Sequence, residues 1–370
     1  MKRGTKLLYK KIFAGLLGGG MLFMPNWSYA LPSGGQVVTN NGTITAGGKV
    51  MDITGSGNVA IDWNSFNIAA DEIVNFKNMQ AVLNYVSGGS KSKIFGKLNG
   101  AGVNVFLVNP NGILFGKTAQ VNVGQLTAST RSLEKAALNS FNGSLSPLDA
   151  GGAANVKADI INLGKLKAGK LVLEGNNLSI IGADSLEVTD KSKITLRAGE
   201  NINIGYEVTD KTTIDVGDGK GNTHQVSDYG KGGGDKASDV LSTASVTDLK
   251  GSAKSINDAM LVHDVYELQA IDRNTGTING SSYVVGNYML TGDIDAGDTK
   301  NWNSGRGFDP IGRLNRTGNG VTGSFSGAFD GMGHSIQNLY IRQISGRSET
   351  NMMVISACLK ELAKAAVSAM

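Results

Sequence analysis

The residues best suited to chemistry are acidic side chains in the last third of the chain. Asp293, Asp295 and Asp298 stand within GDIDAGD, and Arg306 and Arg313 follow a short distance later. Carboxylates clustered on one face with a basic partner could cleave a polysaccharide by acid–base chemistry. Aspartates at such spacings also cap tight turns. We favour turn capping and predict no catalytic residue; a polysaccharide-cleaving enzyme is kept as the alternative.

Metal-ligand residues are few and scattered. The chain has one cysteine, Cys358, and three histidines, His224, His263 and His334. These spacings do not resemble a zinc site, and a single cysteine cannot form an internal disulfide. We therefore predict no metal and no cofactor, and a fold held together by packing and backbone hydrogen bonds.

Residues 1–30 have the three parts of a secretory signal peptide. A basic start, MKRGTKLLYKK, precedes an apolar run over 12–24 and the sequence Ser28-Tyr29-Ala30, which predicts cleavage after Ala30. The apolar run spans only about 20 Å, short of a membrane core of roughly 30 Å. Removing five basic residues with this peptide changes the counts from 35 basic and 31 acidic to 30 and 31, so the net charge changes from +4 to −1. We predict no nucleic-acid partner and no stable membrane span.

The remaining sequence predicts an all-β protein with many tight turns. Glycine accounts for 52 residues and proline for only 5. Short β runs such as VAIDW (59–63) and VNVFLV (103–108) alternate with Gly/Asn turns. Two runs of equal length, over 170–182 and 193–205, begin 23 residues apart with a third run, LEV, between them. Three short strands in this period predict a parallel β-helix, in which each coil of chain stacks on the last.

This architecture implies further features. Asparagines at equivalent positions of successive coils should form hydrogen-bonded ladders. Strands near residues 35–60 should cap the open end, and 128–138 favours a short helical turn. Residues 215–239 are Gly-rich with few apolar side chains, which predicts a long surface loop. Coils of this period over 31–342 would number about 13, in a rod of about 60 Å.

The most specific stretch is IFGKLNGAGVNVFLVNPNGILFG, over 94–116. Asn109, Pro110, Asn111 and Gly112 predict a tight turn between two strands, because proline fixes φ and Asn-Gly tolerates positive φ. Further runs accompany it in a fixed order: NSFNIAADEIVNF, VLNYV, IFGKL and VNVGQLTAST.

This series resembles the N-terminal secretion domain of two-partner-secretion exoproteins of the filamentous-haemagglutinin and high-molecular-weight adhesin type, also called the haemagglutination activity domain. The resemblance implies a right-handed parallel β-helix with an N-terminal cap. It also implies recognition by periplasmic domains of a dedicated outer-membrane barrel transporter. The four residues 109–112 match a family motif linked to secretion competence. A second family motif, Asn-Pro-Asn-Leu, has no counterpart, since the corresponding region reads NFKNMQAVLNYV.

A second resemblance lies downstream, where FSGAFDGMGHSIQNLYI (325–341) is similar to a Gly-rich repeat of bacterial surface proteins. It predicts one more coil, with interior side chains and turn glycines as follows: Phe325, Phe329, Ile336, Leu339 and Ile341 inside; Gly327, Gly331 and Gly333 in turns. His334 would then be a structural turn residue. The last stretch, 345–370, is Ala-rich and favours a helix; we interpret it as the end of a truncated or frame-shifted chain, with a small helical cap as the alternative.

These observations divide the chain as follows: signal peptide 1–30, secretion domain 31–214, Gly-rich linker 215–255, second solenoid segment 256–344 and atypical tail 345–370. The predicted function is that of a secreted adhesin-like exoprotein, which passes through the periplasm to the bacterial cell surface or the medium. Its partners would be the transporter and a receptor or glycan on a host-cell or bacterial surface. Besides the enzyme, the alternatives are the stalk of a toxin and that of a haem-acquisition exoprotein, since fold alone does not choose among them.

Overall fold

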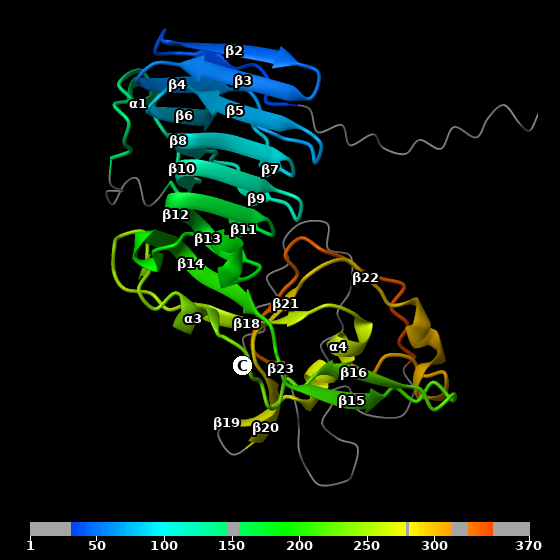
Figure 1. Cartoon of the computed structure of the whole chain (residues 1–370). Helices are drawn as coiled ribbons and strands as arrows, with labels where there is room; N and C mark the ends of the chain where they lie inside the picture. The colour runs from blue at the N-terminus through cyan, green and yellow to red at the C-terminus, as the bar shows by residue number, and fades with distance from the viewer. Residues whose placement is uncertain (1–30, 147–154, 279–280, 313–324, 343–370) are drawn as a thin grey trace, which may run out of the picture.

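The computed structural model describes residues 31–146, 155–278, 281–312 and 325–342. The predicted signal peptide with Ala30, the residues Arg313 and Cys358, and the tail 345–370 lie outside these ranges. The regular part is a parallel β-helix whose strands stack from the N-terminal β2 down to β12 and β14 (Figure 1). The all-β fold class and the parallel solenoid expected from the period are confirmed.

Three stacks of parallel strands form the sides of the solenoid, which we call faces A, B and C. Face A consists of β3 (Val50–Gly55), β5 (Ile73–Lys77), the first parts of β8 (Lys97–Val108), β10 (Gln120–Ser129) and β12 (Lys165–Ile180), and β13 (Leu186–Glu187). Face B consists of β4 (Asn58–Trp63), β6 (Ala81–Val86), later parts of β8, β10 and β12, β14 (Ile194–Tyr206) and β17 (Ser245–Thr247). Face C consists of β7 (Ser92–Ile94), β9 (Ile113–Phe115), β11 (Ile160–Asn162), the ends of β12 and β14, β18 (Asn257–Val262), β21 (Tyr288–Leu290) and β24 (Phe329–Asp330).

The strand register reproduces the period seen in the sequence. Ala81 pairs with Asn104 and Leu171 pairs with Ile194, and each pair is 23 residues apart. Between these coils, Leu126 pairs with Leu171, 45 residues on, because the chain leaves the solenoid and returns. The stack therefore tolerates an insertion at a corner without losing register.

The interior is filled by columns of apolar side chains, one from each coil. A single coil would leave these side chains in water, whereas the next coil covers them, and this burial is the main favourable term in folding. One column, in which no side chain is more than 1% exposed, runs through Val59, Val82, Val105, Leu126, Leu171 and Ile194.

The N-terminal end is closed by antiparallel strands, as expected for residues 35–60. β1 (Gln36–Val37) pairs antiparallel with β4, and β2 (Gly42–Gly47) pairs antiparallel with β3. Figure 1 shows β2 as the outermost strand of the stack. The change of direction ends the parallel stack at this side.

The predicted amide ladders are present. Asn99 Nδ2 donates to Asn75 Oδ1 at 3.0 Å, and Asn75 Nδ2 donates to Asp52 Oδ1 at 2.9 Å. Asp52 accepts without donating, so it suits the end of a ladder. A second ladder runs in the same way through Asn201, Asn177 and Asp159, at 3.1 and 2.7 Å.

The insertion between β10 and β12 folds back onto the solenoid. It contains α1 (Lys135–Asn139), close to the helical turn expected over 128–138. Leu138 and Phe141 are 2% and 8% exposed and pack on the outer side of face B, where the Phe141 ring meets Phe106 edge to face at 5.4 Å. We call residues 130–146 the strap, because it covers an apolar patch that the coils alone leave exposed.

The segment 215–255 differs from the expected Gly-rich loop. It continues a hairpin of β15 (Lys211–Asp215) and β16 (Thr223–Ser227) and contains α3 (Ala237–Val240). Several of its few apolar side chains are buried: Val226, Tyr229 and Leu241 are 1%, 3% and 1% exposed, whereas Val240 is 38% exposed. Leu241 belongs to the solenoid core and closes its lower end, while Val226 and Tyr229 join a second core. The prediction of a surface loop relied on the average composition of the segment, which does not show that its few, widely spaced apolar side chains are buried.

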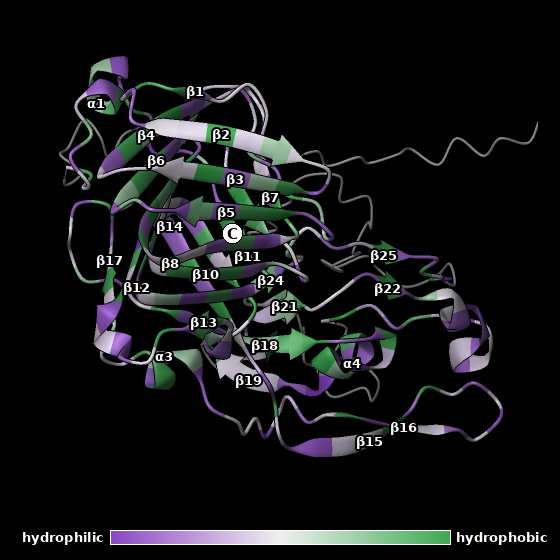
Figure 2. Cartoon of the chain, turned by 45° about the horizontal axis from the view of Figure 1, so that its top comes forward, coloured by the Kyte–Doolittle hydropathy of each residue, from purple (hydrophilic) through white to green (hydrophobic). Residues whose placement is uncertain are grey.

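The second core lies beside the lower end of the solenoid (Figures 1 and 2). Its remaining elements are α4 (Val265–Ala270), β19 (Thr275–Ile278), β20 (Ser281–Val285), β22 (Ile294–Asp295), β23 (Phe325–Ser326), β25 (Ile336–Gln337), and the 3-10 helices at Ile271–Arg273 and Gly297–Ser304. Two further 3-10 helices, Ala183–Ser185 and Lys191–Lys193, belong to the solenoid, on either side of β13.

The Gly-rich repeat adds one more parallel turn to this segment. β23, β24 and β25 pair with β20, β21 and β22, and Tyr288 lies opposite Phe329, 41 residues on. Of the predicted interior side chains, Ile336 is 2% exposed, and Phe325, Phe329, Leu339 and Ile341 are partly buried against the second core. The run of equal coils expected to residue 342 therefore ends near β14, and longer, less regular turns follow.

Candidate functional site

The motif residues 109–112 form the corner between β8 on face B and β9 on face C. The Gly112 amide donates to the Asn109 carbonyl at 3.0 Å, which closes the turn. Gly112 has a φ of 107°, a conformation that other residues adopt only with strain. The tight turn expected from the sequence is present, and it needs glycine at this position.

Asn109 ties this corner to the coils on both sides. Its side chain is buried, and Nδ2 donates to the Ser90 carbonyl and to Ser92 Oγ, both at 2.9 Å. Its Oδ1 accepts from the Asn111 amide at 2.9 Å, and its own amide donates to the Ser129 carbonyl at 3.0 Å. The buried amide therefore has partners for both its donor and its acceptor groups, and it fixes the path of three chain segments.

The remaining two motif residues face outward. Asn111 is exposed and Pro110 is partly exposed. Asn111 Nδ2 donates to the Gly88 carbonyl of the preceding coil at 2.7 Å, which holds the side chain in one orientation. The motif thus combines a buried anchor, Asn109, with a fixed surface feature made by Pro110 and Asn111.

A buried ion pair lies one strand further along, and the sequence interpretation missed it. Arg131 binds Glu174 with two hydrogen bonds of 2.7 Å, from Nε to Oε1 and from Nη2 to Oε2. The Glu174 side chain is fully buried and also accepts from Ser129 Oγ at 2.7 Å, while Arg131 Nη1 donates to the Ser146 carbonyl at 2.7 Å. The pair fastens both ends of the strap to β12. The signal in the sequence was a glutamate inside the apolar strand KLVLEG.

A second polar cluster joins α4 to the β15–β16 hairpin. Glu267 accepts from Ser227 Oγ at 2.8 Å and lies 2.7 Å from His263 Nδ1, while His263 Nε2 lies 3.1 Å from Glu207 Oε1. Burial alone would raise the pKa of Glu267, but hydrogen bonds from His263 and Ser227 outweigh it and lower this pKa to about 2. The hydrogen bond to Glu267 raises the pKa of His263. His263 is thus part of an ion-pair cluster that holds the hairpin in place.

The acidic residues with possible catalytic roles are engaged in turns. Asp293 Oδ1 accepts from the Ser335 amide at 2.7 Å, and Asp295 Oδ1 accepts from the Gly297 amide at 3.0 Å and from Asn338 Nδ2 at 2.9 Å. These are the contacts of turn-capping aspartates. Asp298 lies in the first turn of the 3-10 helix Gly297–Ser304, and Arg306 Nε donates to the Asn303 carbonyl at 3.0 Å.

The other two histidines also have packing roles. His224 stacks on Tyr266 with ring centroids 3.7 Å apart. His334 follows the positive-φ residue Gly333, donates its amide to the Gly331 carbonyl at 2.7 Å, and has Nδ1 at 3.7 Å from Asp293 Oδ1. Burial lowers the pKa of His334. Over the described ranges, no group of three or more His, Cys, Asp or Glu side chains is arranged to hold a metal ion.

Sequence comparison identifies relatives for much of this chain. A curated relative, the heme/hemopexin-binding protein of Haemophilus influenzae, is 34% identical over 177 residues, which cover 46% of this chain and 19% of the relative. Halomucin of Haloquadratum walsbyi is 29% identical over 238 residues, which cover 64% of this chain and 2% of that protein. The chain therefore spans less than a fifth of the length of each of these two relatives.

Among solved structures, the HMW1 secretion domain from Haemophilus influenzae aligns with 83% of this chain and 84% of its own, at 17% identity and a TM-score of 0.31. None of the helices in the described ranges is both long enough and apolar enough to cross a membrane. The TPS secretion domain family matches residues 28–282, more than half of the chain and the whole of the regular β-helix. On this match the chain belongs to the two-partner-secretion (TPS) exoproteins, which are secreted to the cell surface or the medium.

Proposed function

We propose that this chain is the transporter-addressing part of an adhesin-like exoprotein, which crosses the outer membrane through a dedicated barrel transporter and then binds a receptor or glycan. The observation that carries the proposal is the TPS match over residues 28–282, which contains the corner at 109–112. A TPS domain implies an outer-membrane transporter as partner. The adhesin-like role and the assignment of residues to recognition are the finer parts of the proposal.

The fold suggests a simple order of events during export. The chain would cross as an extended polymer and then stack coil by coil from the cap at β1–β4. Each new coil pairs with the exposed edge of the previous one and buries its own apolar side chain, as Val82 does against Val59. Because each step gains hydrogen bonds and burial outside the membrane, a folded coil would oppose return through the transporter.

The corner at 109–112 would act in recognition through its outward residues and in folding through its buried ones. Asn111 and Pro110 are available to a partner, whereas Asn109 and Gly112 hold the turn. In the extended chain that meets the transporter, the same four residues still favour a local turn. Recognition and stability should therefore respond differently to substitutions at Asn111 and Asn109.

The test compares export and stability of Asn111→Ala with those of Asn122→Ala, an exposed asparagine on face A. For Asn111→Ala we expect reduced transporter-dependent release into the medium and a loss of stability of no more than about 1 kcal/mol, from its hydrogen bond to the Gly88 carbonyl. Asn122→Ala should leave both unchanged. Normal release of Asn111→Ala would remove this residue from recognition, although Asn109→Ala should still destabilise the fold.

We assign no catalytic role to Asp293 and Asp295, because their carboxylates are already used by turn amides. The purified chain should release no reducing ends from a broad panel of glycans. Cleavage of any glycan that is lost in the Asp293→Ala/Asp295→Ala variant would instead establish the enzyme alternative.

A second candidate function is capture of haem or a haem carrier, which the name of the heme/hemopexin-binding relative supports. The matched part covers 19% of that relative, so the activity need not lie in the shared segment. Titration of purified chain with haem and with hemopexin tests it. Saturable binding of either ligand would favour haem acquisition by this segment. If the chain is instead the stalk of a longer haem-acquisition or toxin protein, it should bind neither ligand.

A further inference from the structure

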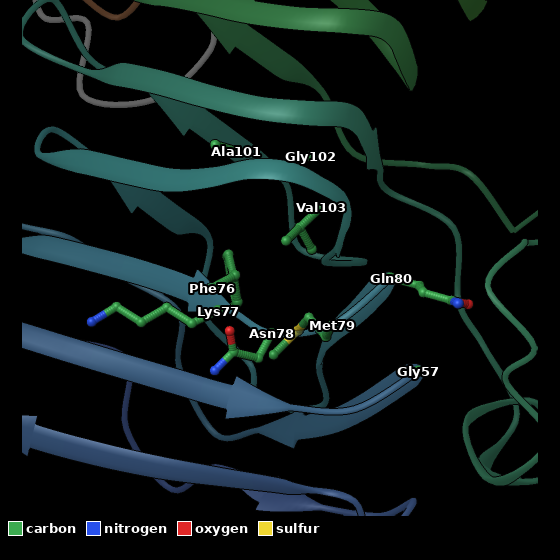
Figure 3. Close-up of a pocket in the computed structure, with 9 residues that line it drawn as sticks. All are labelled: Gly57, Phe76, Lys77, Asn78, Met79, Gln80, Ala101, Gly102 and Val103. Atoms are coloured by element: carbon green, nitrogen blue, oxygen red, sulfur yellow. The ribbon is translucent and has the colours of Figure 1, made fainter.

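Two hollows lie along the corner where face A turns into face B, which we call the A/B groove. The upper hollow, of about 620 Å³, is bordered by the turn after β5 and by the bend within β8 (Figure 3). The lower one, of about 530 Å³, is bordered by the corresponding bends of β10 and β12 and by the start of β14. Both hollows are shallow and open to solvent, so they do not enclose a small ligand. A groove along the solenoid axis suits an extended polymer.

The floor of the groove is made by stacked glycines. A Cβ atom on Gly124 would lie 2.7 Å from the backbone of Gly102, and one on Gly169 would lie 2.9 Å from the Gly124 carbonyl oxygen. Neither Gly124 nor Gly169 has a positive φ, so close approach of the backbones, rather than backbone conformation, requires glycine at these two positions. The bends of β8, β10 and β12 therefore each have a glycine at this position, and this lets the three coils stack closely at the floor of the groove.

The lower hollow carries two lysines without a direct ion pair. Lys170 and Lys193 both line it, next to Gln125 and Ser192. They directly precede Leu171 and Ile194, which pair on neighbouring strands, so the two lysines occupy adjacent coils about 4.8 Å apart. In the ranges that the structure describes, neither ammonium group has a carboxylate within ion-pair distance. The hydrogen bonds from Ser192 and, less strongly, the charge of Lys193 lower the pKa of Asp190, so Lys193 is partly compensated and Lys170 is not.

Lys170 lies in β12 and Lys193 ends the 3-10 helix before β14, and like charges held this close on neighbouring coils repel each other. The upper hollow differs, because its Lys77 is paired with Asp52 at 2.7 Å. An anionic group seated between Lys170 and Lys193 would relieve their repulsion and receive charge-assisted hydrogen bonds. Hydroxyl groups further along the ligand would find amide partners in Gln125 and Gln80.

We propose that the A/B groove binds an acidic polysaccharide, with a carboxylate or sulfate group held by Lys170 and Lys193 and the sugar chain running up the corner. The proposal rests on the adhesin-like function and names its ligand class and site. A nucleic acid fits less well, because single-strand sites use exposed aromatic platforms and the one aromatic residue that lines the hollows, Phe76, is 4% exposed.

The experiment measures binding of the purified full chain to four probes at physiological salt: heparin oligosaccharide, polygalacturonate, dextran and a short DNA duplex. The test variant is Lys170→Gln/Lys193→Gln. Its control is Lys220→Gln/Lys250→Gln, which removes the same charge from two exposed lysines outside the groove. We expect a sulfated or carboxylated glycan to bind, dextran not to bind, and the test variant to bind about tenfold to a hundredfold more weakly than the control.

Thermal unfolding of the variants shows whether a loss of binding comes from a loss of folding. Without ligand, the test variant should melt at the same temperature as the parent or slightly higher, because a repulsive pair has been removed. Absence of binding to both acidic glycans, equal weakening in the control, or DNA binding as tight as glycan binding would each overturn the proposal. Surface attachment of cells carrying the secreted chain is scored in parallel: attachment that persists without acidic-glycan binding refutes the groove but not the adhesin-like function.

Discussion

Replacing Arg131 by methionine should strongly destabilise the β-helix. The change keeps most of the side-chain volume but removes two hydrogen bonds to Glu174 and one to the Ser146 carbonyl. Glu174 is 0% exposed, so its charge would remain buried after its main partner is lost. Breaking a buried pair from one side typically costs about 3–5 kcal/mol.

The structure places the expected cost near the lower end of that range. Arg197 Nη1 lies 3.6 Å from Glu174 Oε2, and Ser129 Oγ still donates to Oε1 at 2.7 Å, so part of the charge stays compensated. We therefore expect about 3 kcal/mol for Arg131→Met. The double variant Arg131→Met/Glu174→Met removes both charges and should recover most of this loss, because a buried pair replaced by apolar side chains is often neutral.

Urea unfolding of the purified chain measures these differences, and the double-mutant cycle gives the coupling between the two side chains. The control is the exposed pair of Lys165 and Glu187, at 3.3 Å, where Lys165→Met should cost no more than about 1 kcal/mol. A cost below 1 kcal/mol for Arg131→Met, or a double variant as unstable as the single one, would refute the argument that the buried ion pair of Arg131 and Glu174 stabilises the fold.

Three further predictions concern the amide ladders, the floor of the A/B groove and the ion-pair cluster of His263 and Glu267. Asn75→Ala interrupts an amide ladder in two places and should cost about 1 kcal/mol in urea unfolding. Gly124→Ala would bring a Cβ to 2.7 Å from Gly102 and should cost about 1–3 kcal/mol; a neutral result would disprove the close stacking at the groove floor. For pH, the raised pKa of His263 gives stability that is present below its unfolded value and lost as pH rises through the folded pKa. The pKa of Glu267, lowered to about 2, gives stability that is present above its unfolded value and lost as pH falls toward 2. Melting temperature should therefore be highest between these two regions, and His263→Gln should flatten its alkaline side; an unchanged profile would exclude the cluster as a source of pH dependence.

The repeated features of this fold were predictable from the sequence. Because each coil repeats the last, the spacing of KLVLEGNNLSIIG and KITLRAGENINIG reports the coil length directly, and the register of Leu171 with Ile194 reproduces it. The amide ladder through Asn75 and Asn99 follows from the same logic, since identical residues at one register position meet in space.

Features that occur once were not predictable in the same way. Arg131 of the strap binds Glu174 of β12, 43 residues further along the sequence, and no local pattern connects the two. The hairpin of β15 and β16 was missed because it buries only isolated apolar residues such as Val226 among many glycines. Likewise, Lys170 and Lys193 become neighbours only because a full coil separates them.

The outward residues of the turn at 109–112 illustrate the limit for the site itself. The sequence indicated the turn and the family motif, but not that Asn109 is buried while Asn111 is exposed. That division depends on the preceding coil, whose Ser90 and Gly88 carbonyls accept from the two amides. Contacts between coils, rather than local propensity, decide which motif residues a partner can reach.

The central claim is that this chain leaves the cell through a dedicated outer-membrane transporter. The most direct measurement follows the chain in the medium and on the cell surface of its own bacterium, with and without the partner transporter gene. We predict that deletion of the transporter abolishes release and surface exposure, and that supplying the gene in trans restores both. Undiminished release from cells without the transporter would contradict the two-partner account.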